Sequence, residues 1–201
     1  MSTNLHTVDA LVPWLDGVAR NDTSQFGEDG LIEAVFARIG TTNRWCFEAG
    51  ASDGLFFSNT KRLRDDGWHA VLVDNDAKQY VSLKEYQSPR VHTFYHHVEV
   101  DSLDRLLSSV GAPSEPDLGV IDVDGQDWWI WNGLIYHSPR VMLVEIHPHN
   151  SASPIPLLRE RDGHHQAGLD HIVTLGTVKG YTLVARTHCN ALFVRSECLS
   201  S

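Results

Sequence analysis

The segment RWCFEAGASDG, residues 44–54, constrains the fold of this chain more than any other. Its apolar part ends at the acid Glu48, and two glycines, Gly50 and Gly54, then bracket a tight turn. A helix-compatible segment follows the turn. The pattern therefore predicts a strand, a glycine loop and a helix, which together open a nucleotide-binding α/β unit.

The spacing and charge of this loop favour one kind of ligand. The glycines follow E-x-G-x-x-x-G, whereas a dinucleotide loop keeps three glycines so that a pyrophosphate can approach the backbone. Glu48 and Asp53 place negative charge where that pyrophosphate would lie. A ligand with an ammonium and a sulfonium suits this charge better. The loop therefore predicts S-adenosylmethionine (SAM) and disfavours an NAD-type oxidoreductase.

Apolar runs and helical periodicities alternate along the rest of the chain. The predicted strands are residues 45–48, 70–74, 90–95, 118–122, 140–146, 181–185 and 191–195. The predicted helices are residues 31–39, preceded by a loop and helix start at 24–30, and residues 59–66, 77–86, 101–107, 128–134 and 167–179. This order predicts an α/β, Rossmann-like, doubly wound and mostly parallel sheet with helices on both faces. The last two strands form a hairpin, which gives the sheet an antiparallel edge.

Four predicted strands end in an acid, namely Glu48, Asp74, Asp122 and Glu145. Ligands of open α/β sheets lie beyond the carboxyl ends of the strands, so we expect these acids on one rim. Asp74 can accept two hydrogen bonds from a ribose diol. Asn75 either shares this role or caps the next turn.

A second group of polar residues extends this rim. Asp122, Asp124 and Asp127 lie within six residues, and like charges this close are costly unless a cation, donors or a ligand offset them. Glu145 and His147 share one face of a strand end and can act as metal ligands or as an acid–base pair. The alternative interpretation is a polar strand end at a cleft.

Catalytic and metal-binding roles are predicted for the acids and the histidine of this rim. The predicted catalytic residues are Asp124, Glu145 and His147. Together with Asp122 they are also the candidate ligands of a divalent metal, Mg, Mn or Fe. His164 and His165 are expected in a solvated loop instead.

Composition limits the partners. A formal net charge of −10 argues against nonspecific nucleic-acid binding, which needs a basic face. No apolar run is long enough for a membrane span, and the first residues do not resemble a secretory signal. Three scattered cysteines fit reduced thiols in a cytoplasm.

The 201 residues predict one domain over 24–201 after an N-terminal lead over 1–23, and leave a homo-oligomer open.

Several short segments occur in the order of a known family. They are SQ-GED at 24–29, FEAGASDG at 47–54, SNT at 58–60, GW at 67–68, VLVD at 71–74, DSLD at 101–104, IDVDG at 121–125, VEI at 144–146 and NALFV at 190–194. Together they resemble the FkbM-type family of class I SAM-dependent methyltransferases. The resemblance implies a seven-stranded sheet with an antiparallel last strand, SAM at the glycine loop, and methyl transfer, often to a hydroxyl oxygen.

The resemblance also assigns residues by position. It implies that Glu145 is an acid near the acceptor, whereas His147 and His149 are not part of a general family pattern. The residues predicted to bind SAM are Gln25, Glu48, Gly50, Ala51, Ser52, Asp53, Gly54, Asn59, Asp74, Asn75, Asp122 and Val123.

The sequence therefore predicts a SAM-dependent methyltransferase acting on a small-molecule or sugar-like hydroxyl. Two alternatives stay open. One is a metal-dependent hydroxyl methyltransferase that uses Asp122, Asp124, Glu145 and His147. The other is a noncatalytic SAM-binding or interaction protein.

Overall fold

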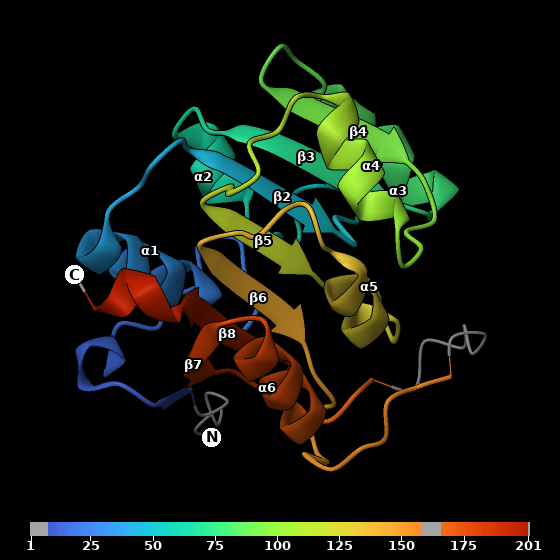
Figure 1. The fold of residues 1–201 in the computed structure, drawn as a ribbon. Helices are drawn as coiled ribbons and strands as arrows, with labels where there is room; N and C mark the ends of the chain where they lie inside the picture. The colour runs from blue at the N-terminus through green and yellow to red at the C-terminus, as the bar shows by residue number, and fades with distance from the viewer. Residues whose placement is uncertain (1–7, 158–165, 201) are drawn as a thin grey trace, which may run out of the picture.

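A computed structural model describes residues 8–157 and 166–200, so His164 and His165 lie outside the described residues (Figure 1). The strands are β1 (Asp9–Ala10), β2 (Trp45–Ala49), β3 (His69–Asp74), β4 (Val91–Tyr95), β5 (Leu118–Ile121), β6 (Val141–Glu145), β7 (Tyr181–Arg186) and β8 (Asn190–Arg195). The α-helices are α1 (Glu28–Ile39), α2 (Lys61–Asp65), α3 (Ala77–Leu83), α4 (Ser102–Ser109), α5 (Asp127–Gly133) and α6 (Leu169–Val178). Three 3-10 helices accompany them, η1 (Pro13–Leu15), η2 (Lys84–Tyr86) and η3 (Ser196–Leu199).

The strands form one eight-stranded sheet in the order β1-β7-β8-β6-β5-β2-β3-β4. β2 to β6 pair in parallel, whereas β8 runs antiparallel between β6 and β7. The predicted doubly wound, mostly parallel sheet with a terminal hairpin is confirmed. The sheet has one strand more than expected, because the two-residue β1 pairs antiparallel with β7. Two residues are too few to show a period of two, so the sequence carries no signal for β1.

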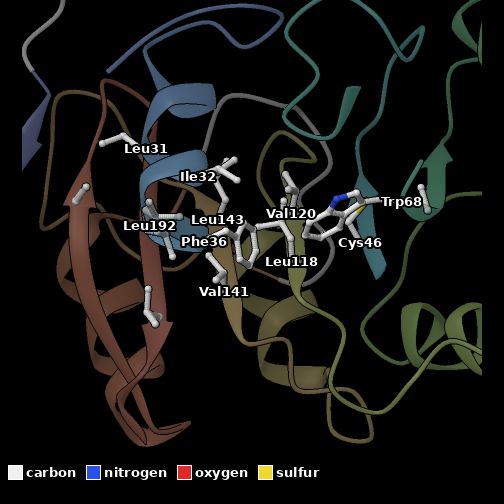
Figure 2. Packing of buried hydrophobic residues seen from close by; sticks show 14 of the residues in the cluster. Leu31, Ile32, Phe36, Cys46, Trp68, Leu118, Val120, Val141, Leu143 and Leu192 are labelled. Atoms are coloured by element: carbon white, nitrogen blue, oxygen red, sulfur yellow. The ribbon is translucent and has the colours of Figure 1, made fainter. Parts of the chain in front are cut away.

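Helices cover both faces of the sheet. α1, α2 and α3 pack on one face, and α4, α5 and α6 pack on the other. Successive residues of each buried strand supply the two cores in turn, so Cys46 of β2 belongs to the first core and Phe47 to the second. Figure 2 shows the first core, in which Ile32 and Phe36 of α1 face residues of β5 and β6, while Leu31 points toward the other side of the helix.

Four of the six α-helices in the described residues, α2, α4, α5 and α6, begin one or two residues from the predicted position, and local contacts explain the starts of α1 and α2. α1 begins at Glu28, within residues 24–30, where the sequence indicates a loop and the start of a helix, and Gly27 adopts a left-handed φ of 101° that turns the chain into the helix. α2 begins only at Lys61, and residues 58–60 instead bond to a buried carboxylate of β2. Within the described parts of the chain, no helix has the length and apolarity needed to cross a membrane.

Candidate ligand-binding site

A cavity of about 850 Å³ lies at the carboxyl ends of the parallel strands. The predicted site residues that line it are Gln25, Glu48, Gly50, Ala51, Ser52, Asp53, Asp74, Asn75, Asp122, Val123, Asp124 and Glu145. Three other predicted site residues, Gly54, Asn59 and His147, are described by the structure but are not part of the lining. The four acids that end strands in the sequence therefore meet at one cavity, as parallel strand ends in an open α/β sheet do.

Gly50 brings two strand ends together. Its φ is 85°, and a Cβ atom placed on it would lie 1.6 Å from the carbonyl oxygen of Asp122. The amides of Gly50 and Ala51 both donate to the Val73 carbonyl, at 2.9 and 3.0 Å. Glycine is therefore required here by the close approach of the β2 and β5 ends, and these two amides hold the loop to β3 instead of pointing at a ligand.

Asp74 holds the same loop from the end of β3. One carboxylate oxygen accepts the amide of Ser52 at 2.7 Å, and the other accepts the amide of Asp76 at 2.7 Å. Each carboxylate oxygen has two lone pairs, so both can accept a further donor from the cavity. Beside it, the Asn75 side-chain nitrogen lies 2.9 Å from Nδ1 of His97, which also lines the cavity.

Glu48 is 2% exposed and is satisfied from within the protein. Its carboxylate accepts the Ser58 hydroxyl at 2.7 Å, the Asn59 amide at 2.8 Å and the Thr60 hydroxyl at 2.6 Å. Burial raises the pKa of Glu48, and these three donors act against that rise. The side chain thus anchors the segment before α2, and this geometry does not favour a direct contact between Glu48 and a ligand ammonium.

Four carboxylates gather where β5 and β6 end. Asp127 accepts the amides of Val123 at 2.8 Å and Gly125 at 3.0 Å, and Glu145 accepts the amide of Asp124 at 3.1 Å. Burial raises the pKa of Asp127 to about 6. Burial, reinforced by the neighbouring acids, raises the pKa of Asp122 and of Glu145 well above their ordinary values. Asp122, Asp127 and Glu145 therefore bind protons more strongly than free carboxylates do.

His147 is not brought to this group. Its Nδ1 accepts the backbone amides of His149 at 3.2 Å and Asn150 at 3.0 Å, so the ring caps its own turn. Across the described residues, no three His, Cys, Asp or Glu side chains are arranged to hold a metal ion. The predicted metal site, which needs His147 beside the three acids, therefore does not fit this donor arrangement.

Segments far apart in the sequence close one side of the cavity. Gln25 and Phe26 line it from the loop before α1, and His188 and Cys189 line it from the β7–β8 turn. The Phe26 and His188 rings lie 5.0 Å apart. Glu28 explains this meeting, because it accepts the Phe26 amide at 2.7 Å and the Thr187 hydroxyl at 2.7 Å. Sequence reasoning missed Phe26, His188 and Cys189 as cavity residues, because no local pattern links positions so far apart.

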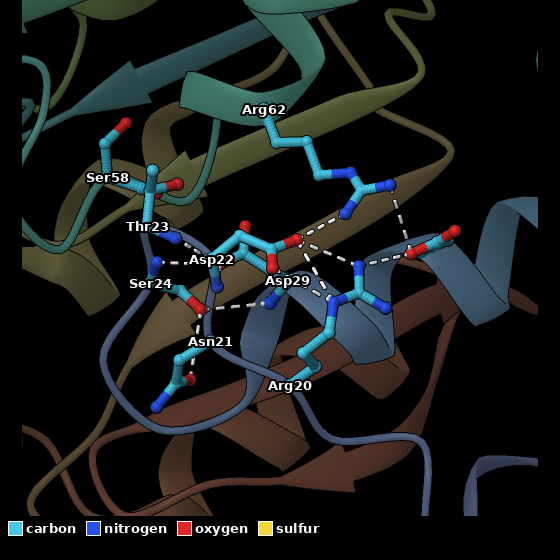
Figure 3. A network of polar contacts seen from close by, with 9 residues as sticks. Arg20, Asn21, Asp22, Thr23, Ser24, Asp29, Ser58 and Arg62 are labelled. Carbon is cyan, nitrogen blue, oxygen red and sulfur yellow. Dashed lines mark hydrogen bonds and ion pairs between the residues drawn. The ribbon is translucent and has the colours of Figure 1, made fainter.

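The loop before α1 is itself held by a polar network (Figure 3). One oxygen of Asp29 accepts the amides of Asp22, Thr23 and Ser24 at 2.8, 2.8 and 2.7 Å. The Thr23 hydroxyl donates to the Ser58 carbonyl at 3.0 Å. Residues 24–29 therefore position Gln25 and Phe26 beside the loop that ends at Ser58.

Backbone strain concentrates at the cavity. Ser52, Phe57 and Asp124 have left-handed φ values of 48°, 59° and 58°, and all three line the cavity. Such conformations are uncommon for residues other than glycine and cluster where a site demands them. No feature of the sequence marks these three positions, because Ser, Phe and Asp usually adopt negative φ.

Solved structures share this fold. A protein assigned as an O-methyltransferase from Klebsiella pneumoniae is 14% identical, with 92% of this chain and 90% of that one aligned at a TM-score of 0.56. A precorrin-6y C5,15-methyltransferase from Geobacter metallireducens is 9% identical, with 89% and 94% aligned at a TM-score of 0.54. A protein assigned as a caffeoyl-CoA O-methyltransferase from Staphylococcus aureus is 14% identical, with 84% and 82% aligned at a TM-score of 0.54.

Comparisons at the level of sequence found nothing comparable. No protein-family model matches this chain, and no curated protein matches its sequence. At identities of 9–14% the structural similarity shows the fold alone, since one fold hosts many functions. The chain has the Rossmann-like fold that these methyltransferases share.

Proposed function

We propose that this chain is a SAM-dependent methyltransferase of the FkbM type that methylates a hydroxyl group of a small-molecule acceptor. The observation that carries the proposal is the cavity at the strand ends. It joins the acidic glycine loop, Asp74 of β3 and Glu145 of β6 in one space of about 850 Å³. This volume is at the upper end of the roughly 300–1,000 Å³ typical of ligand pockets, which leaves room for a cofactor and an acceptor.

The residues of β3 and β4 fit the nucleoside end of SAM. Asp74 keeps lone pairs that can accept a ribose diol, and Asn75 with His97 extends the polar surface beside it. Gln25 and Asp53 lie on the remaining cavity wall and can contact the amino-acid end. Glu48 supports this end indirectly, since it holds residues 58–60 in place.

The acids of β5 and β6 fit the acceptor end. When bound, SAM supplies a sulfonium methyl group, to which the acceptor oxygen bonds as the carbon–sulfur bond breaks. Glu145 is the proton acceptor, because it lines the cavity and because a raised pKa makes its carboxylate a stronger base. The Asp124 amide and the Gln166 side chain, at 3.1 and 3.0 Å, fix its orientation.

The sequence pattern predicted Asp124, Glu145 and His147 as catalytic residues and a divalent metal as a further candidate for this chemistry. The structure favours Glu145, because His147 bonds to its own turn and no described trio of donors suits a metal. We therefore assign proton removal to Glu145 and derive no step through a metal ion.

Mass spectrometry of the purified protein for copurified SAM or S-adenosylhomocysteine tests the proposal first. Titration calorimetry should then show binding of both ligands and much weaker binding of NAD. NAD binding without a response to either SAM-type ligand would contradict the proposal. Binding of S-adenosylhomocysteine without methyl transfer across a broad panel of hydroxyl acceptors would favour a noncatalytic SAM-binding protein instead.

A further inference from the structure

Three consecutive apolar side chains are exposed at the mouth of the cavity. Leu55, Phe56 and Phe57 are 41%, 68% and 60% exposed, and both phenylalanines line the cavity. Burial of apolar surface is favourable, so leaving these side chains exposed to water forgoes stabilisation of the fold. A contiguous exposed apolar patch commonly marks a binding surface. The proposed reaction of the cavity gives Phe56 and Phe57 no role, so they require a separate explanation.

Hydrogen bonds fix the segment that carries these rings at both of its ends. Before them, Asp53 accepts the amides of Leu55 at 2.8 Å and Phe56 at 2.9 Å. After them, Ser58 and Asn59 donate to Glu48 at 2.7 and 2.8 Å. Phe57 also has a left-handed φ of 59°, which is an outlier for a bulky side chain. The exposed rings are therefore a built feature of the fold.

The charge around these rings is one-sided. Seven of the lining residues that the structure describes are acids and none is Lys or Arg; the acids are Glu48, Asp53, Asp74, Asp76, Asp122, Asp124 and Glu145. A phosphate or carboxylate on the acceptor would meet repulsion from the ionised members of this group, with no Lys or Arg in the described lining to offset it. A neutral molecule meets no such penalty, and an ammonium group is attracted both by the acids and by the face of an aromatic ring.

The two rings lie on a part of the cavity wall other than the one that fits the nucleoside. Their segment touches the loop before α1 through Thr23 and Ser58, at 3.0 Å, and that loop supplies Phe26, which packs on His188. Asp74, Asn75 and His97, which fit the nucleoside, come from the ends of β3 and β4 instead.

We propose that Phe56 and Phe57 are specificity-determining residues that pack on an apolar ring of the acceptor. The acceptor is then a small neutral or cationic molecule with an aromatic or other apolar ring near its hydroxyl group, and not an anion. This inference rests on the proposed function, because it takes the cavity to hold SAM and an acceptor together.

Three matched phenols test the inference: tyramine as the cation, 4-ethylphenol as the neutral compound and 4-hydroxyphenylacetate as the anion. Titration calorimetry on protein saturated with S-adenosylhomocysteine measures their Kd, and methyl transfer from labelled SAM measures turnover. We expect tyramine and 4-ethylphenol to bind at least tenfold more tightly than the anion. Phe56→Ala and Phe57→Ala should each weaken phenol binding by about tenfold, since aromatic contacts dominate such pockets.

Two controls accompany the variants. Tyr136→Ala removes another exposed aromatic side chain, 77% exposed and outside the cavity lining, and should leave phenol binding unchanged. Phe57→Leu is a second variant for the case that Phe57→Ala fails to fold. It keeps an apolar side chain at the left-handed position, so it should retain most of the phenol binding.

The readouts separate the inference from the proposed function. Weaker binding of S-adenosylhomocysteine in Phe56→Ala and Phe57→Ala would assign the rings to the cofactor and overturn the inference alone. The inference is equally overturned if the anion binds as tightly as 4-ethylphenol, or if no phenol binds the loaded protein. Wild-type protein that binds no S-adenosylhomocysteine would instead contradict the proposed function.

Discussion

Carboxylate side chains perform two different tasks in this chain. Glu48 and Asp29 are buried and accept three donors each from the protein, so they hold loops in place. Asp74 and Glu145 line the cavity, as Glu48 does, but each accepts only two protein donors and keeps capacity for a ligand. Residue type alone does not separate these tasks, because both begin as an acid at the end of an apolar run or the start of a helix.

Asp74→Asn should weaken binding of S-adenosylhomocysteine. The amide keeps one acceptor oxygen but loses the charge-assisted hydrogen bond to a ribose diol, which is worth about 1.5–3 kcal/mol, or roughly tenfold or more in affinity. Calorimetry measures the change. Asp65→Asn, in an exposed ion pair with Lys61, is the control and should leave the Kd unchanged. An unchanged Kd in a folded Asp74→Asn protein would make Asp74 a loop acid only.

Glu145→Gln should lower methyl transfer by about 10²–10⁴-fold while binding of S-adenosylhomocysteine persists, because a positioned base contributes about that factor. His147→Gln should remain active, since its ring caps a turn. Wild-type activity should rise with pH through an apparent pKa above the ordinary 4.5 of glutamate, because the base must lose its proton. The opposite ranking of the two variants in a labelled-methyl assay would restore His147 as the base.

Strands and loops meet most closely where β2 and β5 end. The Gly50 loop approaches the Asp122 carbonyl so closely that no side chain fits between them. On the other side, the Val73 carbonyl accepts two amides of the same loop. The ends of β2, β3 and β5 are therefore joined at the cavity through the Gly50 loop.

Gly50→Ala should destabilise the protein by at least about 2 kcal/mol, because it adds both a left-handed alanine and a clash with backbone. Denaturant unfolding measures the loss. Gly111→Ala is the matched control: its φ is 71°, but nothing lies within 4 Å of an added Cβ. The control should cost only about 1 kcal/mol. Equal losses in the two variants would show that the contact with Asp122 has no energetic weight.

The two ends of the sheet have different roles in the molecule: one surrounds the cavity, and the other holds a buried cluster that stabilises the fold. The carboxyl ends of the strands surround the cavity. At the other end, the fully buried Asp117 accepts the amides of Thr42, Asn43 and Arg44 at 2.9, 2.9 and 2.7 Å. It also pairs with Arg140 at 2.8 Å. This cluster ties the entries of β2, β5 and β6 together without contacting the cavity.

Asp117→Asn should therefore lower stability without changing ligand affinity. Breaking a buried pair leaves an uncompensated charge on Arg140 and costs about 3 kcal/mol or more. Thermal unfolding measures the loss, and calorimetry at a temperature where the variant is folded should return the wild-type Kd for S-adenosylhomocysteine. Glu115→Gln removes an exposed partner of Arg195 and should cost less than about 1 kcal/mol. A comparable loss in both variants would contradict this division.

Most of the elements were predictable because their signals are local. Alternating apolar runs and helical periods located the seven long strands and all six α-helices of the described chain, with ends shifted by a few residues. The seventh and eighth strands formed the expected hairpin. The start of α2 was wrong by two residues, because Glu48 takes the donors of residues 58–60. That competition involves a side chain ten residues earlier and leaves no periodic trace.

The cavity was predictable only in part. Acids at four strand ends indicated its place, because parallel strands end on one side of a sheet. Which other residues line the cavity depends on contacts in the folded chain. Glu28 joins the Phe26 loop to the β7–β8 turn, so both line the cavity. His147 bonds to its own turn and is not part of the lining. The sequence alone determined the order of elements and the acidic rim, since both depend on residue type and spacing. The tertiary structure decided which acids face the ligand and which hold loops, because that depends on where each donor lies in space.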